Sequence, residues 1–523
     1  MPQWISGAEA IAKIRTGDHV CLIGNINLLE PETILHELEQ SYITSGTPRD
    51  LTVSFPVFIG SEEGKGIDHL AHEGLVKRLI GGSYASMMPN RKMNELIVAN
   101  QVEAYNIPMG SLYNLLRDTG AGKPGLVTGV GLNTFADPRY GGGKLNERTQ
   151  EELCEVVKLN GGEWLFYPRL KVNVAIIRAT SADELGNLSL EKEPTSQGIL
   201  AIAMAARNNG GIVIAQVRRK IARGSIHPKM VTVPSKLVDY LVLDERDEAI
   251  VQSHPGSVMG EFRQPIETRR PIPLDHRKVI MRRALFEFRQ GDFVNLGFGI
   301  PAGLPAVAHE ENLLDDIRFT IEHGPIGGVP GWTGVFGVSM NPDLILDSTQ
   351  VFDLYDGGLL DMTCLGMGEV DRFGNVNNHK FKHIIAGTGG FNDIIYATPK
   401  IVLAGTFTVG GLKTEIRDGK LIIVQEGKFR KFNREIEGIT LNAKEALGKK
   451  QRVMYVTERA VFELSEDGLV LTEAAPGIDV ESQILGLLDF PVAVSPELRT
   501  MNPRIFRPEP MRVRLTRTGC ECV

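Results

Sequence analysis

The stretch FTIEHGPIGG, residues 319–328, is the part of the chain that most restricts its fold and function. Phe319–Ile321 is a short run of aromatic and β-branched residues, which predicts the end of a buried strand. The Gly- and Pro-rich residues 323–328 predict the loop that follows. Ligands of open α/β sheets bind at loops beyond the carboxyl ends of strands, so Glu322 would meet a substrate there. The competing interpretation is a merely solvated glutamate, which base rates favour for an isolated carboxylate.

The composition predicts a globular protein with more than one domain. A chain of 523 residues exceeds what one ordinary hydrophobic core holds. The net charge of −7 offers no general attraction to nucleic acid or anionic lipid. The N-terminus has no signal- or transit-peptide pattern, and no apolar run has membrane-spanning length. We therefore expect a cytoplasmic protein with no nucleic-acid and no membrane partner.

Two short sequence signals recur in the same order in the two halves of the chain. A Gly-Asp turn at residues 17–18 recurs at 291–292, and an Asp-x-x-Gly-Asn turn at 183–187 recurs at 371–375. This order predicts a duplicated α/β unit. The two signals are farther apart in the first half, which predicts an insertion around residues 70–160.

Helices and strands alternate along both halves, which predicts α/β lobes with parallel sheets. The expected domains are an N-terminal lobe at 1–260, an extended Pro- and Arg-rich linker at 261–277, and a C-terminal lobe at 278–523. Strands are expected at 20–23, 51–60, before 183 and from 212, and helices after Pro31, from 198 and at 276–289.

Three small-residue loops could approach a ligand closely. The loop at 296–303 contains Gly297 and Gly299, but its Gly-x-Gly-x-x-x-Gly spacing is one residue too long for a dinucleotide fingerprint. A helix N-terminus starting at Pro301 and facing an anionic group, or a simple turn, fits it better. The third loop, at 129–146, is long and polar and lies in the predicted insertion.

The second loop, AGTGGFNDI at residues 386–394, has two interpretations. Its glycines, including Gly389 and Gly390, could free backbone amides to point at one spot, as an oxyanion site needs. Alternatively, the loop is a turn that packs Phe391 into the core. The residues alone do not separate the two.

Metal and serine-hydrolase chemistry find little support in the residues. The HEEN sequence at 309–312 lacks a second histidine, and the histidines show no metal-ligand spacing with carboxylates. No Gly-x-Ser-x-Gly motif occurs. Five scattered cysteines fit reduced thiols, and Cys520-Glu521-Cys522 is expected to be an inert, frayed tail. We expect no metal.

Long, ordered blocks of the sequence resemble the family I coenzyme A transferases, in particular the fused single-chain members that act on acetate, propionate or 3-oxoacids. The blocks are IEHGPIGG (321–328), FDLYDGGLLDMTCLGMGEVDRFGNVN (352–377), GTGGFNDI (387–394), YVTERAVFELSEDGLVLTEAAPGIDVESQIL (455–485), NTFADPRYGGGKLN (133–146) and IIRATSADELGNLSLEKE (176–193). The resemblance runs over nearly the whole chain.

The resemblance implies two related α/β lobes with the active site at their interface. It implies that Glu322, in the E-x-G-x-x-G-G block, is the nucleophile, although His323 stands where relatives often have a small or polar residue. Amides of Gly389 and Gly390 would stabilise acyl oxyanions, with Gly297, Gly299 and Asn25 binding substrate. The GNIN loop that carries Asn25 departs from the family's small-residue pattern. The family also implies a homodimer or homotetramer.

The implied activity is ping-pong transfer of coenzyme A between a short-chain acyl-CoA and a free carboxylic acid. It proceeds through a glutamyl-CoA thioester, with no cofactor beyond coenzyme A and no metal. The alternatives are an acyl-CoA hydrolase on the same fold and a non-catalytic sensor of acyl-CoA or a sugar phosphate. Trp332 and Phe336 could line the acyl pocket or belong to the core.

Overall fold

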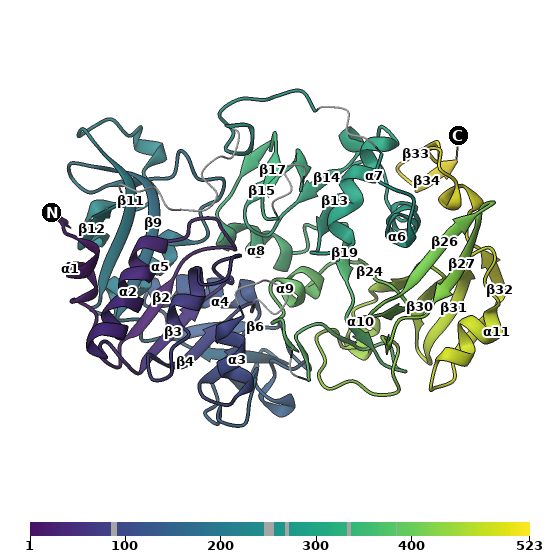
Figure 1. The fold of residues 1–523 in the computed structure, drawn as a ribbon, viewed down its shortest axis with the longest axis horizontal. Coiled ribbons are helices and arrows are strands. Elements are labelled where there is room, and N and C mark those ends of the chain that lie inside the picture. Colours follow the sequence, from purple (N-terminus) through teal and green to yellow (C-terminus); the bar gives the residue numbers. More distant parts are fainter. Residues whose placement is uncertain (85–90, 245–255, 267–270, 332–335, 383, 523) are drawn as a thin grey trace. The chain divides into compact units, whose positions relative to one another are not determined.

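The computed structural model describes residues 1–84, 91–244, 256–266, 271–331, 336–382 and 384–522 (Figure 1). The chain forms two compact units. The first comprises Met1–Phe262, Ile345–Asp353 and His379–Asp393, and the second Arg263–Leu344, Leu354–Asn378 and Ile394–Val523. Two segments from the second half of the chain thus group with the first unit, which the predicted lobe boundaries did not include.

The predicted linker is partly helical. Its residues 267–270 lie outside the described residues, and its last two, His276 and Arg277, begin helix α6 (His276–Leu285). Asp275 caps this helix by accepting a hydrogen bond from the Lys278 amide at 2.9 Å. The linker was therefore predicted two residues too long, and the basic helix expected at 276–289 ends at Leu285.

The first unit contains a nine-stranded sheet. Its order is β1 (Gln3–Trp4), β12 (Tyr240–Leu243), β11 (Ile212–Ile221), β9 (Val174–Asp183), β2 (His19–Leu22), β3 (Leu51–Phe55), β4 (Val76–Gly81) and β5 (Glu103–Asn106), with β10 (Leu188–Ser189) antiparallel on β9. All pairs along the main path are parallel. Every residue of β9 is buried, as expected for a parallel strand covered on both faces.

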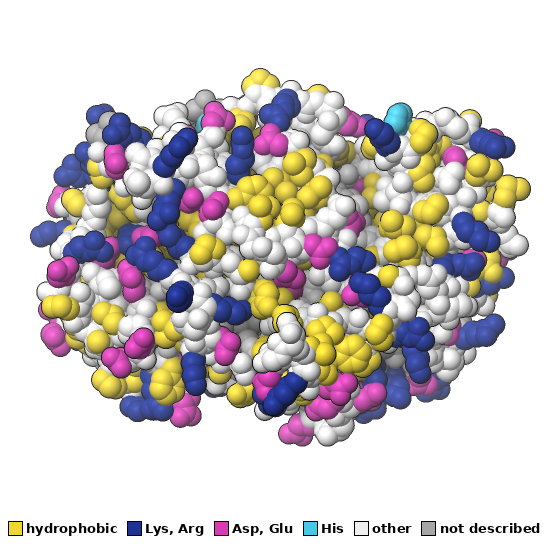
Figure 2. Space-filling model, turned by 180° about the vertical axis from the view of Figure 1, so that it is seen from behind, with side chains coloured by type: hydrophobic (Ala, Val, Ile, Leu, Met, Phe, Trp, Pro, Cys, Tyr) yellow, Lys and Arg dark blue, Asp and Glu magenta, His cyan; other side chains and the backbone are white. Residues whose placement is uncertain are grey.

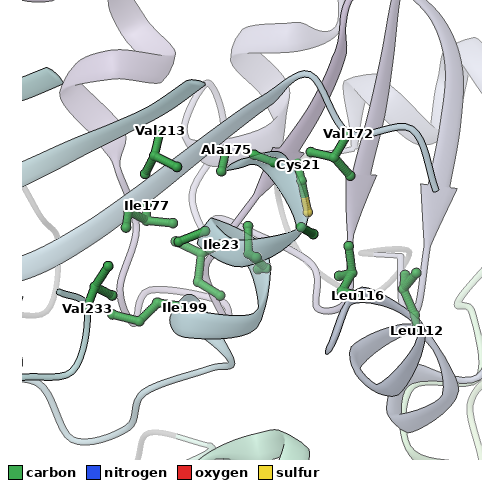
Figure 3. Close-up of a cluster of buried hydrophobic side chains, with 14 of the residues drawn as sticks. Cys21, Ile23, Leu112, Leu116, Val172, Ala175, Ile177, Ile199, Val213 and Val233 are labelled. Atoms are coloured by element: carbon green, nitrogen blue, oxygen red, sulfur yellow. The ribbon is translucent and has the colours of Figure 1, made fainter. Parts of the chain in front are cut away.

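Helices α2 (Glu32–Ser45), α4 (Met109–Gly120) and α5 (Ile199–Asn208) belong to this unit. Pro31 directly precedes α2, and Gly46 ends it with a φ of 70° that favours glycine. Figure 3 shows part of the core, in which Ile177 and Val213 of the sheet lie near Ile199 of α5. Apolar side chains from neighbouring strands and α5 thus bury one another.

The second unit contains a ten-stranded sheet. From its second strand onward the order is β15 (Pro325–Ile326), β14 (Arg318–Thr320), β13 (Phe293–Leu296), β19 (Met362–Gly366), β24 (Lys400–Ala404), β29 (Arg452–Val456), β30 (Ala460–Ser465), β31 (Gly468–Ala474) and β32 (Ala493–Thr500). Strands β14, β13, β19, β24 and β29 pair in parallel. Helices α6 and α7 (Leu304–Glu310) contribute Val279, Ile280 and Val307 to its core.

The strand orders confirm the internal duplication. In the first unit the parallel strands run β3-β2-β9-β11-β12, and in the second β14-β13-β19-β24-β29, so the two series correspond in chain order and position. Between β3 and β9 the first unit carries β4, β5 and additional elements. These are α3 (Lys92–Val98), α4, β6 (Gly125–Thr128), β7 (Glu155–Leu159) and β8 (Gly162–Pro168), which confirms the insertion predicted around residues 70–160.

The two recurring turns also have the same hydrogen bonds in both copies. Asp183 accepts main-chain bonds from residues two and four positions later and one from the Asn187 side chain, at 3.0, 2.8 and 3.0 Å. Asp371 accepts the corresponding three bonds at 2.9, 2.9 and 2.8 Å. Asp18 and Asp292 each accept a bond, 2.8 Å in both cases, from the amide three residues earlier. These carboxylates therefore fix turns and are structural.

Positive and negative side chains are interspersed over the face shown in Figure 2. No helix in the described part of the chain has the length and apolarity needed to cross a bilayer. Strand β34 (Cys520–Cys522) pairs antiparallel with β33 (Val513–Leu515). The expectation of a frayed cysteine tail is thus wrong, because this segment is a hairpin and Cys520 packs against the core of the second unit.

Candidate active site

Glu322 lies in a tight turn at the carboxyl end of β14, in the second unit. The strand ends at Thr320, which pairs with Ile326 of β15, and the Gly324 amide donates to the Ile321 carbonyl at 3.0 Å. Glu322 and His323 thus occupy the two central positions of a β-turn. The predicted strand end is confirmed, and the strand does not continue past the glutamate. The loop predicted at 323–328 is only partly correct, because Pro325 and Ile326 form strand β15, which pairs antiparallel with β14.

The Glu322 side chain is buried. The residue is 7% exposed, and its Oε2 accepts a hydrogen bond from Asn295 Nδ2 at 3.2 Å. No ion pair to Glu322 occurs among the described residues, and its Oε1 receives no hydrogen bond from them. Burying a carboxylate without a neighbouring cation costs free energy, and a glutamate with no role would be expected at the surface instead. The interpretation of Glu322 as a merely solvated glutamate is therefore wrong.

Asn295 belongs to a small polar network under this turn. It is fully buried on β13, beside Thr320 in the sheet register. Its Nδ2 lies 3.4 Å from the Tyr355 hydroxyl, which donates to Thr320 Oγ1 at 2.7 Å. Burial, followed by the nearby Glu322 charge, raises the pKa of Tyr355, so the phenol stays neutral. Neither Asn295 nor Tyr355 was predicted from the sequence, although a lone asparagine in the apolar run FVNL was a usable signal.

His323 is 2% exposed, and neither ring nitrogen has a hydrogen-bond partner among the described residues. Burial lowers the pKa of His323, against the opposing effect of Glu322, so the ring is neutral. Its centroid lies 5.9 Å from that of Phe336, edge to face, and Phe336 also contacts Phe298 at 5.4 Å. Phe336 therefore lies beside the turn of Glu322, whereas Trp332 lies outside the described residues.

Gly297 and Gly299 follow β13 in the same unit. The Gly297 amide donates to the Cys364 carbonyl at 2.9 Å, and an added Cβ there would lie 3.1 Å from the Leu365 Cα. The lack of a side chain at Gly297 thus permits close packing on β19, and its amide already donates a hydrogen bond within the protein. Gly299 is exposed with a φ of 91°, and Pro301 begins the helical turn that leads into α7, as predicted.

Gly389 and Gly390 belong to the first unit. The Gly389 amide donates to the Gly82 carbonyl at 2.9 Å, so this conformation does not offer it to a ligand. Gly390 is buried, and no described residue accepts from its amide. Phe391 is also buried, as the packing interpretation of this loop expects. The oxyanion role of either glycine stays a prediction.

Asn25 also belongs to the first unit and is fully buried, and neither polar atom of its side chain has a partner among the described residues. Its backbone pairs with that of Leu28, at 2.9 and 2.7 Å. The fully buried Glu30 further along this loop has both carboxyl oxygens unpaired. Burial, then repulsion from Glu32, raises the pKa of Glu30 well above its usual value.

One expectation about histidines is wrong. His36 and Glu39 are three residues apart on α2, and together with His69 they bring three ligand atoms within 4.8 Å of one another. No other group of three or more His, Cys, Asp or Glu residues with this proximity occurs in the described ranges. The pair was not predicted, although the His36-x-x-Glu39 spacing within an expected helix was a usable signal.

Glu322 is a buried carboxylate held by the neutral side chain of Asn295, at the carboxyl end of parallel strands. This arrangement fits an α/β enzyme that works by covalent catalysis. The family model described as coenzyme A transferase matches residues 5–244. The acetate CoA-transferase YdiF of Escherichia coli K12 is 43% identical over 505 residues, 96% of this chain and 94% of that protein. A caffeate CoA-transferase of Acetobacterium woodii is 38% identical over 520 residues, 97% and 98% of the two chains.

Solved structures agree with the sequence relatives. The crystal structure of the acyl-CoA transferase YdiF apoenzyme from Escherichia coli O157:H7 has a TM-score of 0.92 and 42% identity, covering 98% of both chains. A structure of that transferase as a thioester complex with CoA has a TM-score of 0.92 and 41% identity, again covering 98% of both. The present chain belongs to the coenzyme A transferase family. It is a single-chain CoA-transferase that works through a thioester intermediate.

Proposed function

We propose that Glu322 is the carboxylate that carries coenzyme A during transfer. The observation behind this proposal is the burial of Glu322 at 7% exposure, with one oxygen held by Asn295 Nδ2 and no described cation beside it. A desolvated carboxylate without a counter-ion is a better nucleophile than a solvated one. The hydrogen bond from Asn295 restricts its orientation without neutralising it.

The chemistry would proceed in two mirrored halves. Glu322 Oε1 attacks the thioester carbonyl of the acyl-CoA, the C–S bond breaks, and a mixed anhydride and the CoA thiolate form. The thiolate then attacks the glutamyl carbonyl, the bond from that carbon to the bridging oxygen breaks, and the first carboxylate leaves. A second carboxylate reverses both steps and departs as its CoA thioester. The thioester energy stays in the covalent intermediate, so the balance requires neither ATP nor a metal.

Asn295 is proposed to act in both attacks on the glutamyl group. Its N–H is 3.2 Å from Oε2, the oxygen that becomes the glutamyl carbonyl oxygen once Oε1 is acylated. When the thiolate attacks that carbonyl, negative charge develops on Oε2, where the donor already stands. The Gly390 amide is a second candidate donor, for the acyl oxyanion, because no described residue accepts from it. To act as a donor, the Gly389 amide would first have to break its hydrogen bond to the Gly82 carbonyl.

The proposed substrate-binding residues also include Gly297, Gly299 and Asn25. The observations that support this role differ from one residue to the next. Gly299 and Asn25 have, respectively, an open backbone position and an unpaired, fully buried amide. Gly297 has the least support as a donor because its amide is engaged. An unpaired buried polar group typically costs about 1–3 kcal/mol, which a ligand contact would recover.

The substrates are proposed to be a short-chain acyl-CoA and a free carboxylic acid. The named relatives are an acetate and a caffeate CoA-transferase, so the carboxylic acids in their names are a small aliphatic acid and an aromatic one. We further propose a cytoplasmic homodimer or homotetramer without nucleic-acid or membrane partners. A panel of acyl-CoA donors and carboxylate acceptors, followed by product mass, would identify the preferred pair.

One experiment separates the proposed transferase from the two alternatives. The enzyme is incubated with acetyl-CoA, with and without a second carboxylate, while free CoA and the new acyl-CoA are quantified. A transferase forms the new thioester with little net CoA release. A hydrolase releases CoA at the same rate without acceptor, and a sensor binds acetyl-CoA with neither product nor covalent adduct.

A further inference from the structure

We propose that His36, Glu39 and His69 of the first unit form a binding site for a divalent transition-metal ion such as Zn²⁺, with His72 as a fourth ligand. One ligand atom from each of the first three residues lies within 4.8 Å of the other two. Tetrahedral zinc ligands stand roughly 3.3 Å apart. Glu39 Oε2 and His69 Nδ1, now 2.6 Å apart, would therefore separate slightly as the ion enters, and small side-chain rotations would bring the remaining ligand atoms in. The site takes no part in the transfer chemistry proposed for Glu322.

The backbone supplies the arrangement from two short segments. His36 and Glu39 lie three residues apart on α2, which places both on one face of the helix. His69 lies in the helical turn Gly66–Leu70, and His72 lies two residues beyond that turn. Glu39 joins the segments, since its two oxygens lie 2.6 Å from His69 Nδ1 and 2.7 Å from His72 Nε2.

The surroundings of His69 are those of a metal-bound imidazole. Its Nε2 lies 2.8 Å from Glu32 Oε1, and the Glu32 side chain is 1% exposed. The other oxygen of Glu32 accepts a bond from the Gly66 amide at 3.0 Å, which fixes the carboxylate. Ligating histidines commonly donate their second ring N–H to such a carboxylate, which sets the tautomer and presents the remaining nitrogen to the metal. Here the remaining nitrogen is Nδ1, the atom that faces Glu39.

His36 supports a ligand role independently of this network. No described residue forms a hydrogen bond with its ring, yet its centroid lies only 5.6 Å from that of His69, edge to face. The site can also be reached by an ion, because the side chains of Glu39 and His72 are 18% and 34% exposed. Imidazole with carboxylate favours Zn²⁺, Ni²⁺, Cu²⁺ or Co²⁺ over Ca²⁺ and Mg²⁺. A bound ion would cross-link α2 to the Gly66–Leu70 turn.

The test uses the full-length enzyme without a polyhistidine tag, stripped with a chelator and titrated with Co²⁺. Bound metal is counted by mass spectrometry, and the visible absorption of Co²⁺ reports its coordination. We expect one Co²⁺ per chain with a tetrahedral spectrum, displaced by Zn²⁺, and a rise in Tm of about 2–3 °C at a hundredfold excess over Kd.

Two variants and one control decide the outcome. His36→Ala removes a ring that makes no hydrogen bond with the described residues, so the fold should persist while Co²⁺ affinity falls at least tenfold. Glu39→Gln should likewise leave the fold intact and lower the Co²⁺ affinity at least tenfold. His227→Ala, at an exposed histidine outside the cluster, should bind Co²⁺ as the wild type does. CoA transfer should be unchanged in all three, which keeps this result separate from the role of Glu322. A wild type that binds no Co²⁺ or Zn²⁺, or binding that survives both His36→Ala and Glu39→Gln, would overturn the proposal and leave a metal-free hydrogen-bonded cluster.

Discussion

Replacing Asn295 with leucine tests how the Glu322 carboxylate is held. The change removes the donor 3.2 Å from Glu322 Oε2 while keeping the same branched arrangement of four side-chain heavy atoms at a fully buried position. A hydrogen bond to a charged group contributes about 1.5–3 kcal/mol, which corresponds to roughly 10- to 150-fold in rate. If the same N–H also stabilises the oxyanion on Oε2, the loss reaches roughly 10²–10³-fold.

The assay is the rate of covalent CoA adduct formation after rapid mixing of enzyme with acyl-CoA, followed by intact mass. Tyr355→Phe is the matched control from the same network. It removes the hydroxyl that donates to Thr320 at 2.7 Å but keeps the Asn295–Glu322 bond. We expect Tyr355→Phe to form adduct within about threefold of the wild-type rate. If folded Asn295→Leu also stays within threefold, Asn295 neither positions Glu322 nor stabilises charge on it.

Two further predictions concern the stability of the first unit. His19 is buried against Ser54, and burial, followed by the charge of Arg78, lowers its pKa to about 4 from 6.5. The unfolded chain therefore binds one more proton between these values, so the free energy of unfolding should fall by about 3 kcal/mol as pH drops from 6.5 to 4. His19→Gln, measured by urea unfolding, should lack this part of the pH dependence; an unchanged slope would show that His19 is not its source. Gly66→Ala should destabilise the enzyme by at least about 2 kcal/mol, because the φ is 59° and the new Cβ would meet the Ile59 carbonyl at 2.4 Å; a Tm within 1 °C of wild type would contradict this.

The elements that the sequence predicted well are those set by local patterns. The apolar runs predicted as strands at 20–23, at 51–60 and before 183 became β2, β3 and β9, because a fully buried parallel strand needs a continuous apolar segment. Strand β3 ends at Phe55, five residues earlier than predicted, where Pro56 interrupts the run. The duplication was visible because its turns depend on an Asp side chain and a Gly backbone within five residues. The place of Glu322 directly after a strand was predicted from the local pattern, whereas its role as nucleophile was inferred from the family block and stays a prediction.

What the sequence did not predict depends on contacts between distant segments. Asn295 meets Glu322 because β13 and β14 pair with Asn295 beside Thr320, and one residue of slip would turn it away. The Gly389 amide meets Gly82 across more than three hundred positions in the chain. His69 reaches Glu39 from another element. In the ligand cluster, therefore, only the pair on α2 can be recognised from spacing in the sequence. Register and packing, rather than residue type, determine all three.

The most direct test of the central claim is the intact mass of the enzyme after incubation with acyl-CoA alone. The wild type should gain the mass of one coenzyme A at Glu322. Glu322→Ala should gain nothing and lose transfer activity, and Glu322→Asp should be strongly impaired because its carboxylate is one methylene shorter. Glu466→Gln, at an exposed glutamate, is the control and should form the adduct normally. A CoA adduct or substantial transfer activity in Glu322→Ala would show that another group carries coenzyme A.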